Sequence, residues 1–168
     1  MAIPTATVRA TEPALPTGPI AHRLARVFID GTPQVPTDRE LALLNAWIDA
    51  EFRVIPVMVR FTSADIDLSA MLQHLGVHGE LLISIAHNDH PFVEGFQNAK
   101  FRAVHDWHHV ITGADSTFAG EFAAYEHAVQ RAPIEIHWIL FSEIVLQAAA
   151  CIATGTFQPQ KLVRAPGF

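Results

Sequence analysis

Four residues with metal-binding side chains stand at a fixed spacing in the second half of the chain. They form the pattern His105-Asp106-x-x-His109, followed by eleven residues and then Glu121. Successive residues on a helix are about 100° apart, so the first three side chains project within about a quarter turn. Two imidazoles and two carboxylates make a borderline-to-hard ligand set that suits zinc, iron or manganese. The pattern therefore predicts a divalent metal site with these four ligands and with zinc or iron as the cofactor.

A short turn is expected to bring Glu121 to the other three ligands. Gly113 ends the helix that carries His109, because glycine favours the conformation that follows a helix. Candidate N-caps of the next helix are Asp115, Ser116 and Thr117. Two helices joined by so short a connection pack antiparallel. His109 and Glu121 then lie at the same end of the helix pair.

Two further charged residues are candidate catalytic groups. Arg102 projects from the same arc as His105 and His109, where it holds either an anion or a ligand carboxylate. The alternative for Arg102 is a surface salt bridge, which stabilises a protein little. Glu143 lies in an apolar segment and needs a partner if it is buried. It accepts a hydrogen bond either from a ligating imidazole or from a purely structural donor.

Other residues near the motif are expected either to line the site or to lie outside it. His108 points about 60° to the other side of His105 and is expected outside the ligand set. His127 is expected in solvent. Aromatic residues on the general face of Glu121 are expected to wall the site, namely Phe118, Phe122 and Tyr125.

Two other pairs of histidines are interpreted as structural. His74 and His78 straddle Gly76, so they are not expected to share one helical face. His87 and His90 stand just before a proline, where a helix C-terminus favours histidine through the helix dipole.

Composition excludes some classes of function. The net charge of −6 and the presence of only 11 Lys and Arg residues argue against a nucleic-acid partner, which requires clustered positive charge. The single cysteine, Cys151, lies in an apolar run and is interpreted as a small core residue in a reducing, cytoplasmic compartment. Half of the residues are hydrophobic, so we expect a sizeable core, a hydrophobic ligand and, as further possibilities, a homodimer or peripheral membrane contact.

The pattern of apolar residues predicts one all-α domain, a bundle of about seven helices. Residues 1–19, rich in Ala, Thr and Pro, are predicted to be a flexible lead-in, and residues 20–168 form the domain. Thr37-x-x-Glu40 is a capping box, and Ser63 is a candidate N-cap of a helix that Gly76 closes. Residues 57–61 are β-branched enough for a short extended segment. The expected helical segments are 21–30, 37–55, 63–76, 80–88, 92–112, 117–132 and 133–155.

Residues 134–154 form the most apolar segment and are about long enough to span a bilayer. The segment nevertheless contains Glu135, His137, Glu143 and Gln147. A charged residue at the centre of a membrane helix costs about 2.5–3.5 kcal/mol on insertion scales. We therefore expect a buried helix of a soluble protein.

The segment from Phe101 to Ala149, about a third of the chain, resembles the ubiquinone (coenzyme Q) biosynthesis protein 4 family. The residues that carry the resemblance are His105-Asp106-x-x-His109, Val110-Ile111-Thr112-Gly113 and Gly120-Glu121. The resemblance implies an all-α protein whose four motif residues bind a divalent metal, classically zinc. It also implies a hydrophobic, possibly prenylated, aromatic acid as substrate, with removal of the ring carboxylate and hydroxylation at the same carbon.

Three functions are open on this evidence. The first is a metal-dependent enzyme that modifies a hydrophobic aromatic acid. The second is a non-catalytic lipid-binding or scaffold protein of quinone biosynthesis in which the metal is structural. The third is a phosphohydrolase of the His-Asp superfamily, for which His87 or His90, the His105-Asp106 pair and Asp115 occur in the required order.

Overall fold

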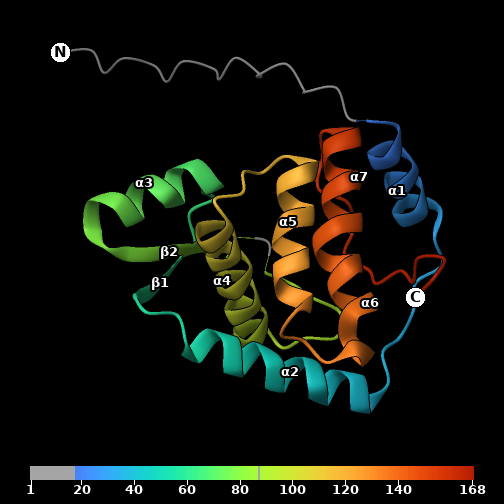
Figure 1. Cartoon of the computed structure of the whole chain (residues 1–168), viewed down its shortest axis with the longest axis horizontal. Helices are drawn as coiled ribbons and strands as arrows, with labels where there is room; N and C mark the ends of the chain where they lie inside the picture. The colour runs from blue at the N-terminus through green and yellow to red at the C-terminus, as the bar shows by residue number, and fades with distance from the viewer. Residues whose placement is uncertain (1–17, 87) are drawn as a thin grey trace.

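Six helices and one pair of short strands make up the part of the chain described by the computed structural model, residues 18–86 and 88–168 (Figure 1). The first five helices are α1 (Pro19–Asp30), α2 (Asp38–Arg53), α3 (Leu68–His78), α4 (Gly95–Thr112) and α5 (Phe118–Val129). The last helix comprises η1 (Ile134–Ile136), α6 (His137–Leu140), η2 (Phe141–Leu146) and α7 (Gln147–Thr154). The strands are β1 (Met58–Thr62) and β2 (Glu80–Ser84). The prediction of a mainly helical protein is confirmed, although the strands are an addition to it.

One of the two strands lies where a short extended segment was expected, and the other lies where a helix was expected. They pair in parallel, with Met58 opposite Glu80 and Thr62 opposite Ser84. The short extended segment predicted near β1 is present, but the apolar run that begins at Glu80 is a strand, not a helix. Leu81 and Ile83 of β2 are completely buried. A run buried at alternate positions suits a short strand, and so short an apolar run does not by itself distinguish the two structures.

The boundaries of α3 differ from the predicted ones. Its N-cap is Asp67, whose carboxylate accepts a hydrogen bond from the Ala70 amide at 2.8 Å, and not Ser63. The helix continues through Gly76 and ends at Gly79, which has the left-handed φ of 67°. Glycine has no Cβ and adopts this conformation without strain, so Gly79 is the better C-terminal residue.

The extension of α3 changes the position of two histidines. His74 and His78 lie on one face of the helix, with ring centroids 4.4 Å apart, and the prediction that Gly76 separates them is wrong. The His74 Nε2 atom is 3.8 Å from a carboxylate oxygen of Glu80, which also accepts a hydrogen bond from Arg60 at 2.6 Å.

The start of α2, the end of α4 and the start of α5 follow the predicted local signals. Thr37 and Glu40 form the capping box in both directions. Gly113 ends α4 with a φ of 66°, and the Thr117 hydroxyl accepts a hydrogen bond from the Gly120 amide to begin α5. The loop between α4 and α5 is therefore short, and the two helices lie side by side (Figure 1).

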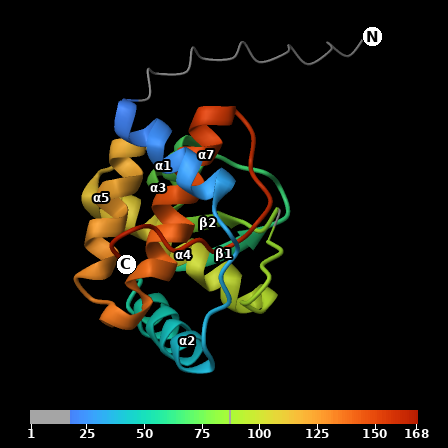
Figure 2. The same cartoon turned by 90° about the vertical axis from the view of Figure 1, so that its right-hand side faces the viewer.

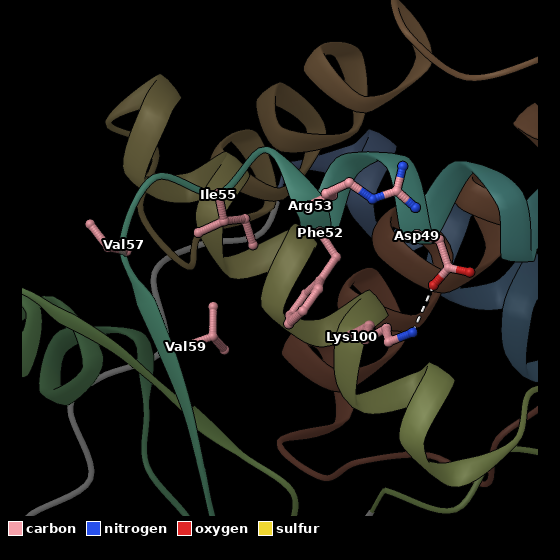
Figure 3. Close-up of a pocket in the computed structure, with 7 residues that line it drawn as sticks. All are labelled: Asp49, Phe52, Arg53, Ile55, Val57, Val59 and Lys100. Atoms are coloured by element: carbon pink, nitrogen blue, oxygen red, sulfur yellow. Dashed lines mark hydrogen bonds and ion pairs between the residues drawn. The ribbon is translucent and has the colours of Figure 1, made fainter.

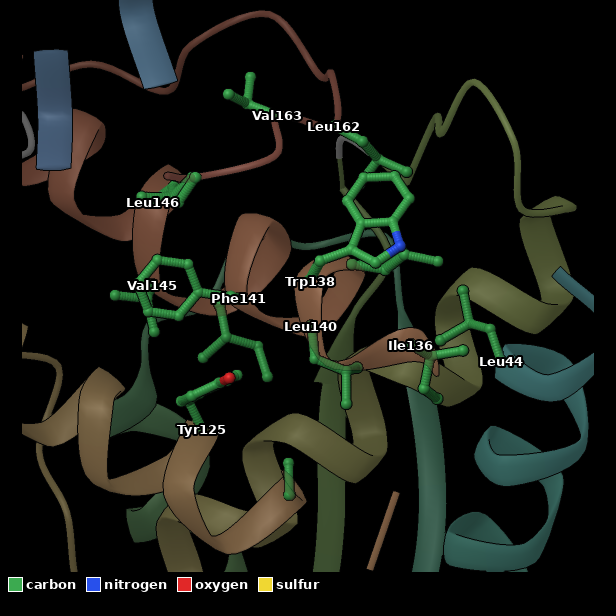
Figure 4. Packing of buried hydrophobic residues seen from close by; sticks show 14 of the residues in the cluster. Leu44, Tyr125, Ile136, Trp138, Leu140, Phe141, Val145, Leu146, Leu162 and Val163 are labelled. Atoms are coloured by element: carbon green, nitrogen blue, oxygen red, sulfur yellow. The ribbon is translucent and has the colours of Figure 1, made fainter. Parts of the chain in front are cut away.

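The last helix is the centre of the main apolar core (Figure 4). Ile136, Ile139, Leu140 and Leu146 are fully buried, and α1 and α5 pack against this helix (Figure 2). The segment Ile134–Thr154 has a mean hydropathy of 1.7 in its most apolar window, but 67% of that window is buried. It is compatible with the core of a soluble protein, as predicted.

The predicted lead-in, residues 1–19, lies outside the described residues except for its last two. Pro19 is the first residue of α1, where proline is favourable because its fixed φ suits a helix and its missing amide hydrogen is not needed.

Candidate metal centre and its pocket

Three polar atoms from α4 and α5 converge in a small triangle. The Nε2 atoms of His105 and His109 are 3.2 Å apart, and Glu121 Oε2 lies 3.2 Å from the first and 3.5 Å from the second. Ligands bound tetrahedrally at 2.0–2.1 Å from a zinc ion lie about 3.3–3.4 Å from one another. The triangle therefore has the size of one face of a zinc coordination tetrahedron. In the described part of the chain, no other three potential ligand residues are clustered this tightly.

Helix geometry and the short loop between α4 and α5 bring these three atoms together. One helical turn separates His105 from His109, which places their rings edge to face with centroids 4.7 Å apart. Glu121 enters from the first turn of α5, across the short loop. His109 Nδ1 lies 3.2 Å from the Ala114 carbonyl oxygen, to which it donates when Nε2 is the free ligand atom. A hydrogen bond of this kind sets the orientation of many metal-binding histidines.

The electrostatics of the triangle favour an ionised carboxylate. Burial raises the pKa of Glu121, but the adjacent His105 and His109 outweigh burial and lower its pKa to about 2. Burial lowers the pKa of His105, but the facing carboxylate of Glu121, with a smaller effect from Asp106, raises it overall. A cation and a proton therefore compete for the same nitrogen and oxygen atoms.

Asp106 lies beside this triangle but is not part of it. It is not among the three residues whose ligand atoms lie within 4.8 Å of one another. Burial raises the pKa of the Asp106 carboxyl, although His105, His109 and Arg102 act in the opposite direction. Direct ligation by Asp106 remains a prediction. The position of Asp106 beside the triangle suits a group whose own charge acts on the neighbouring histidines.

The triangle opens on a pocket of about 360 Å³ between α3, α4, α5 and the last helix. His105, Asp106 and Glu121 line one part of it, and Glu143 lines another. Much of the remaining wall is apolar, from Ile66, Leu68, Met71, Phe101, Ile144, Ile152 and Phe157. An apolar pocket with a few polar groups is the usual form of a small-molecule site.

The aromatic wall differs from the predicted one. Phe118 and Tyr125 pack in or against the main core, and Phe122 is partly exposed to solvent. None of the three lines the pocket. Phe122 is about 100° from Glu121 around α5, and Phe118 and Tyr125 pack in or against the main core, so Glu121 is the residue of α5 that lines the pocket. The observed aromatic residues, Phe101 and Phe157, come from α4 and the C-terminal segment.

Arg102 lines the pocket, as its place in the arc suggested. Its guanidinium donates a hydrogen bond to the Ala86 carbonyl oxygen at 2.8 Å. This bond orients the side chain and leaves further N–H groups of the guanidinium for a ligand.

Glu143 is buried at the pocket wall, with 7% of its side chain exposed. Its Oε1 is 3.3 Å from His90 Nε2, and its Oε2 accepts a hydrogen bond from Gln160 at 2.7 Å. Neither partner is one of the clustered histidines, so of the two predicted roles the structure favours an acceptor for other donors. His90 lies in the loop before α4, not at a helix C-terminus as predicted, because the residues before it form β2. His87 lies outside the described residues.

His108 faces away from the triangle, in contact with α2 and α5. It is 2% exposed, and its ring lies 4.9 Å from that of His127 and 6.2 Å from that of Trp47, centroid to centroid. Burial, followed by the positive charges of His127, His105 and Arg131, lowers the pKa of His108 to about 3. His127 is only half-buried and packs on His108, so the expectation that it lies free in solvent is wrong.

Cys151 also lines the pocket and is half-buried. Burial, together with the negative charge of Glu121, raises the pKa of its thiol. A protonated thiol is a poor nucleophile, which agrees with its interpretation as a packing residue.

A larger groove of about 580 Å³ lies beside the junction of α2 and β1 (Figure 3). Asp49 and Lys100 form an ion pair there, with Lys100 Nζ 2.7 Å from Asp49 Oδ1. The other lining residues are Phe52, Arg53, Ile55, Val57 and Val59. This groove has no histidine and one carboxylate, already paired, so the smaller pocket is the better candidate for chemistry.

No family model, curated protein or solved structure matches this chain. The resemblance to the ubiquinone biosynthesis protein 4 family therefore rests on the motif residues alone. The candidate site is defined by the triangle of His105, His109 and Glu121 and by the pocket beside it.

Proposed function

We propose that the protein is a divalent-metal-dependent enzyme that acts on a hydrophobic small molecule. The observation that carries the proposal is the triangle of His105 Nε2, His109 Nε2 and Glu121 Oε2, with sides of 3.2, 3.2 and 3.5 Å. Zinc or iron suits two imidazoles and one carboxylate. The motif agrees with the resemblance to the ubiquinone biosynthesis protein 4 family, whose chemistry would be decarboxylation and hydroxylation of an aromatic acid.

The number of ligands favours a catalytic over a structural metal. Structural zinc sites have four protein ligands, whereas catalytic sites have three and keep a position for water or substrate. The triangle supplies three and adjoins a pocket. A bound cation would supply Lewis-acid chemistry at that open position. The chain's own residues hold the ligand: apolar side chains bind its body and Arg102 is placed to donate hydrogen bonds to an anionic group.

The phosphohydrolase alternative has less support. Asp115 is exposed, and its carboxylate accepts hydrogen bonds from Thr117, the N-cap of α5. His90 is bound to Glu143 and is not among the three clustered residues. Of the residues that this class would need, Asp115 and His90 therefore have other partners.

Elemental analysis of the purified protein tests the metal proposal. We expect close to one equivalent of zinc or iron in the wild type, and loss of it in His105→Ala and Glu121→Ala. His108→Asn is the matched control, because it removes an imidazole of α4 that lies outside the triangle and should keep the metal. Absence of metal from the wild type, with no binding of added Zn²⁺ or Fe²⁺, would contradict the proposal.

Two measurements test the ligand and the reaction. Mass spectrometry of compounds extracted from the native protein should find hydrophobic molecules, and finding only phosphates would contradict a hydrophobic substrate. If Glu121→Ala loses metal but leaves cellular quinone levels intact, quinone biosynthesis is excluded as the pathway. If that variant also keeps full function in cells, the metal is not catalytic and the scaffold function is favoured.

A further inference from the structure

Glu143 is a buried carboxylate whose negative charge has no counter-ion among the described residues. Its only ionisable partner within ion-pair distance in that part of the chain is His90, which is 2% exposed. His90 Nδ1 accepts hydrogen bonds from the amides of Phe92 and Val93 at 3.1 and 2.9 Å. A ring nitrogen that accepts two hydrogen bonds bears no proton, so the proton is on Nε2 and the ring is neutral. His90 therefore donates a hydrogen bond to Glu143 without balancing its charge.

The remaining contacts of Glu143 hold it in place and also leave its charge unbalanced. Gln160 donates to Oε2 at 2.7 Å, and Gln147 in turn donates to the Gln160 side-chain oxygen at 2.6 Å. Both glutamines are neutral. An isolated buried charge is unfavourable unless a partner compensates it. Each carboxylate oxygen has lone pairs beyond the one already used, and the carboxylate lines the pocket.

The backbone around Glu143 is also unusual. Residues Phe141–Leu146 form a π-helical turn inside the last helix. Such turns are rare and occur frequently at functional sites. The turn lies in the most deeply buried helix, where regular α-helix would be expected from the apolar sequence.

We propose that Glu143 binds the hydrogen-bond donor, a protonated amine or a hydroxyl, of an apolar small molecule whose body fills the pocket. His90 and Gln160 are positioning residues that orient the carboxylate. This inference deepens the proposed function and rests on it for the use of the pocket. It specifies the chemistry of the ligand at the wall contributed by the last helix, whereas the metal centre lies at the wall contributed by α4 and α5.

Binding of three biphenyl probes to metal-free, chelator-treated protein tests the inference. Two probes carry a donor, 4-phenylphenol and 4-phenylbenzylamine, and the third, 4-methoxybiphenyl, has the same body but no donor. Hydrogen bonds to charged groups are worth about 1.5–3 kcal/mol, so at least one donor probe should bind the wild type about tenfold or more tightly than the ether. Calorimetry or ligand-observed NMR measures the three dissociation constants.

The variants separate recognition from folding. Glu143→Gln keeps the shape and removes the charge, and we expect it to reduce the preference to about threefold or less. Glu126→Gln makes the same change at an exposed position of α5 and should keep the full preference. If Glu143→Gln does not fold, Glu143→Asp withdraws the carboxylate by one methylene and is expected to lose the preference in the same way.

The outcomes are distinguishable from those of the metal proposal. Equal binding of the three probes to the wild type, or an unchanged preference in folded Glu143→Gln, overturns the inference and makes Glu143 a structural acceptor. Because the probes are measured without metal and Zn²⁺ binding is measured separately, loss of zinc binding with an intact donor preference overturns only the metal proposal.

Discussion

Helix α4 presents two faces that carry the same residue type in opposite environments. On one face, His105 and His109 converge on the Glu121 carboxylate within 3.2–3.5 Å. On the other, His108 is buried against Trp47, and its Nε2 atom lies 3.8 Å from Glu51 Oε2. Glu51 already forms an ion pair with Arg131 at 2.8 Å. Among the described residues, the ion-pair partners of Glu121 are histidines, so its carboxylate can be shared with a cation, whereas Glu51 is neutralised by an arginine.

The difference shows that the pKa of a buried histidine depends on whether the nearby carboxylate is already paired with an arginine. The pKa of His105 is raised by Glu121 despite burial, and that of His108 falls to about 3 because burial and the neighbouring positive charges, first that of His127, act in the same direction. Two imidazole nitrogens of α4, His105 Nδ1 and His108 Nδ1, are buried without a hydrogen-bond partner among the described residues.

Zinc should stabilise the protein through one face of α4 only, and this is the largest expected effect. At a free Zn²⁺ concentration about 1,000 times the dissociation constant, linkage gives the wild type about 4 kcal/mol. Thermal unfolding with and without Zn²⁺ measures it. His109→Ala and Glu121→Ala should lose the stabilisation, whereas His108→Leu should keep it. Equal stabilisation of all four proteins would mean that zinc binds elsewhere.

The two faces should also differ in their response to acid. Folding lowers the pKa of His108 from 6.5 to about 3, so the unfolded state binds a proton that the folded state does not, and stability is lost as pH falls below about 6.5. In metal-free protein, His108→Leu should change stability little at pH 7 and be about 2–3 kcal/mol more stable than the wild type at pH 4.5. Urea unfolding at both pH values measures this.

The exposed histidine on α3 provides the control for that experiment. His78→Gln should show the same pH dependence as the wild type, because the residue is exposed. A His108→Leu variant whose stability changes with pH as the wild type does would contradict the assignment of a neutral, buried His108.

Substitution of Asp106 sharpens the boundary of the metal centre. Asp106→Asn removes a nearby charge but no member of the triangle, and outer groups of this kind change metal affinity by about 10–100-fold. We expect about tenfold weaker binding of Zn²⁺, measured by competition with a chromophoric chelator. A loss as large as that of Glu121→Ala would instead identify Asp106 as a direct ligand.

The smallest effect is expected at Glu51, the carboxylate of α2 that lies beside His108. Glu51→Gln weakens the hydrogen bonds from Arg131, whose side chain is 53% exposed, so the expected loss of stability is about 1 kcal/mol. Chemical denaturation measures the loss. Zn²⁺ affinity should be unchanged, and a reduction would show that the two faces of α4 are coupled.

Local signals predicted the start of α2, the end of α4 and the start of α5 well, and the ends of α3 and strand β2 poorly. Thr37 with Glu40, Gly113 and Thr117 act through hydrogen bonds or φ angles within a few residues, so their effect is visible in the sequence. Strand β2 depends on pairing with β1 across a separation that includes α3. An apolar run such as Leu81 to Ile83 is compatible with either structure until its partner is known.

Within the candidate site, the sequence by itself determined that His105 and His109 share a helical face and that a short turn returns Glu121 to them, because helix geometry and glycine conformation are local properties. Only the tertiary structure decided that Asp106 lies beside the triangle, that no aromatic residue of α5 lines the pocket, and that Glu143 faces the same pocket with a neutral histidine behind it. These features depend on how α5 and the last helix pack around α4, which is set by side chains far apart in the chain.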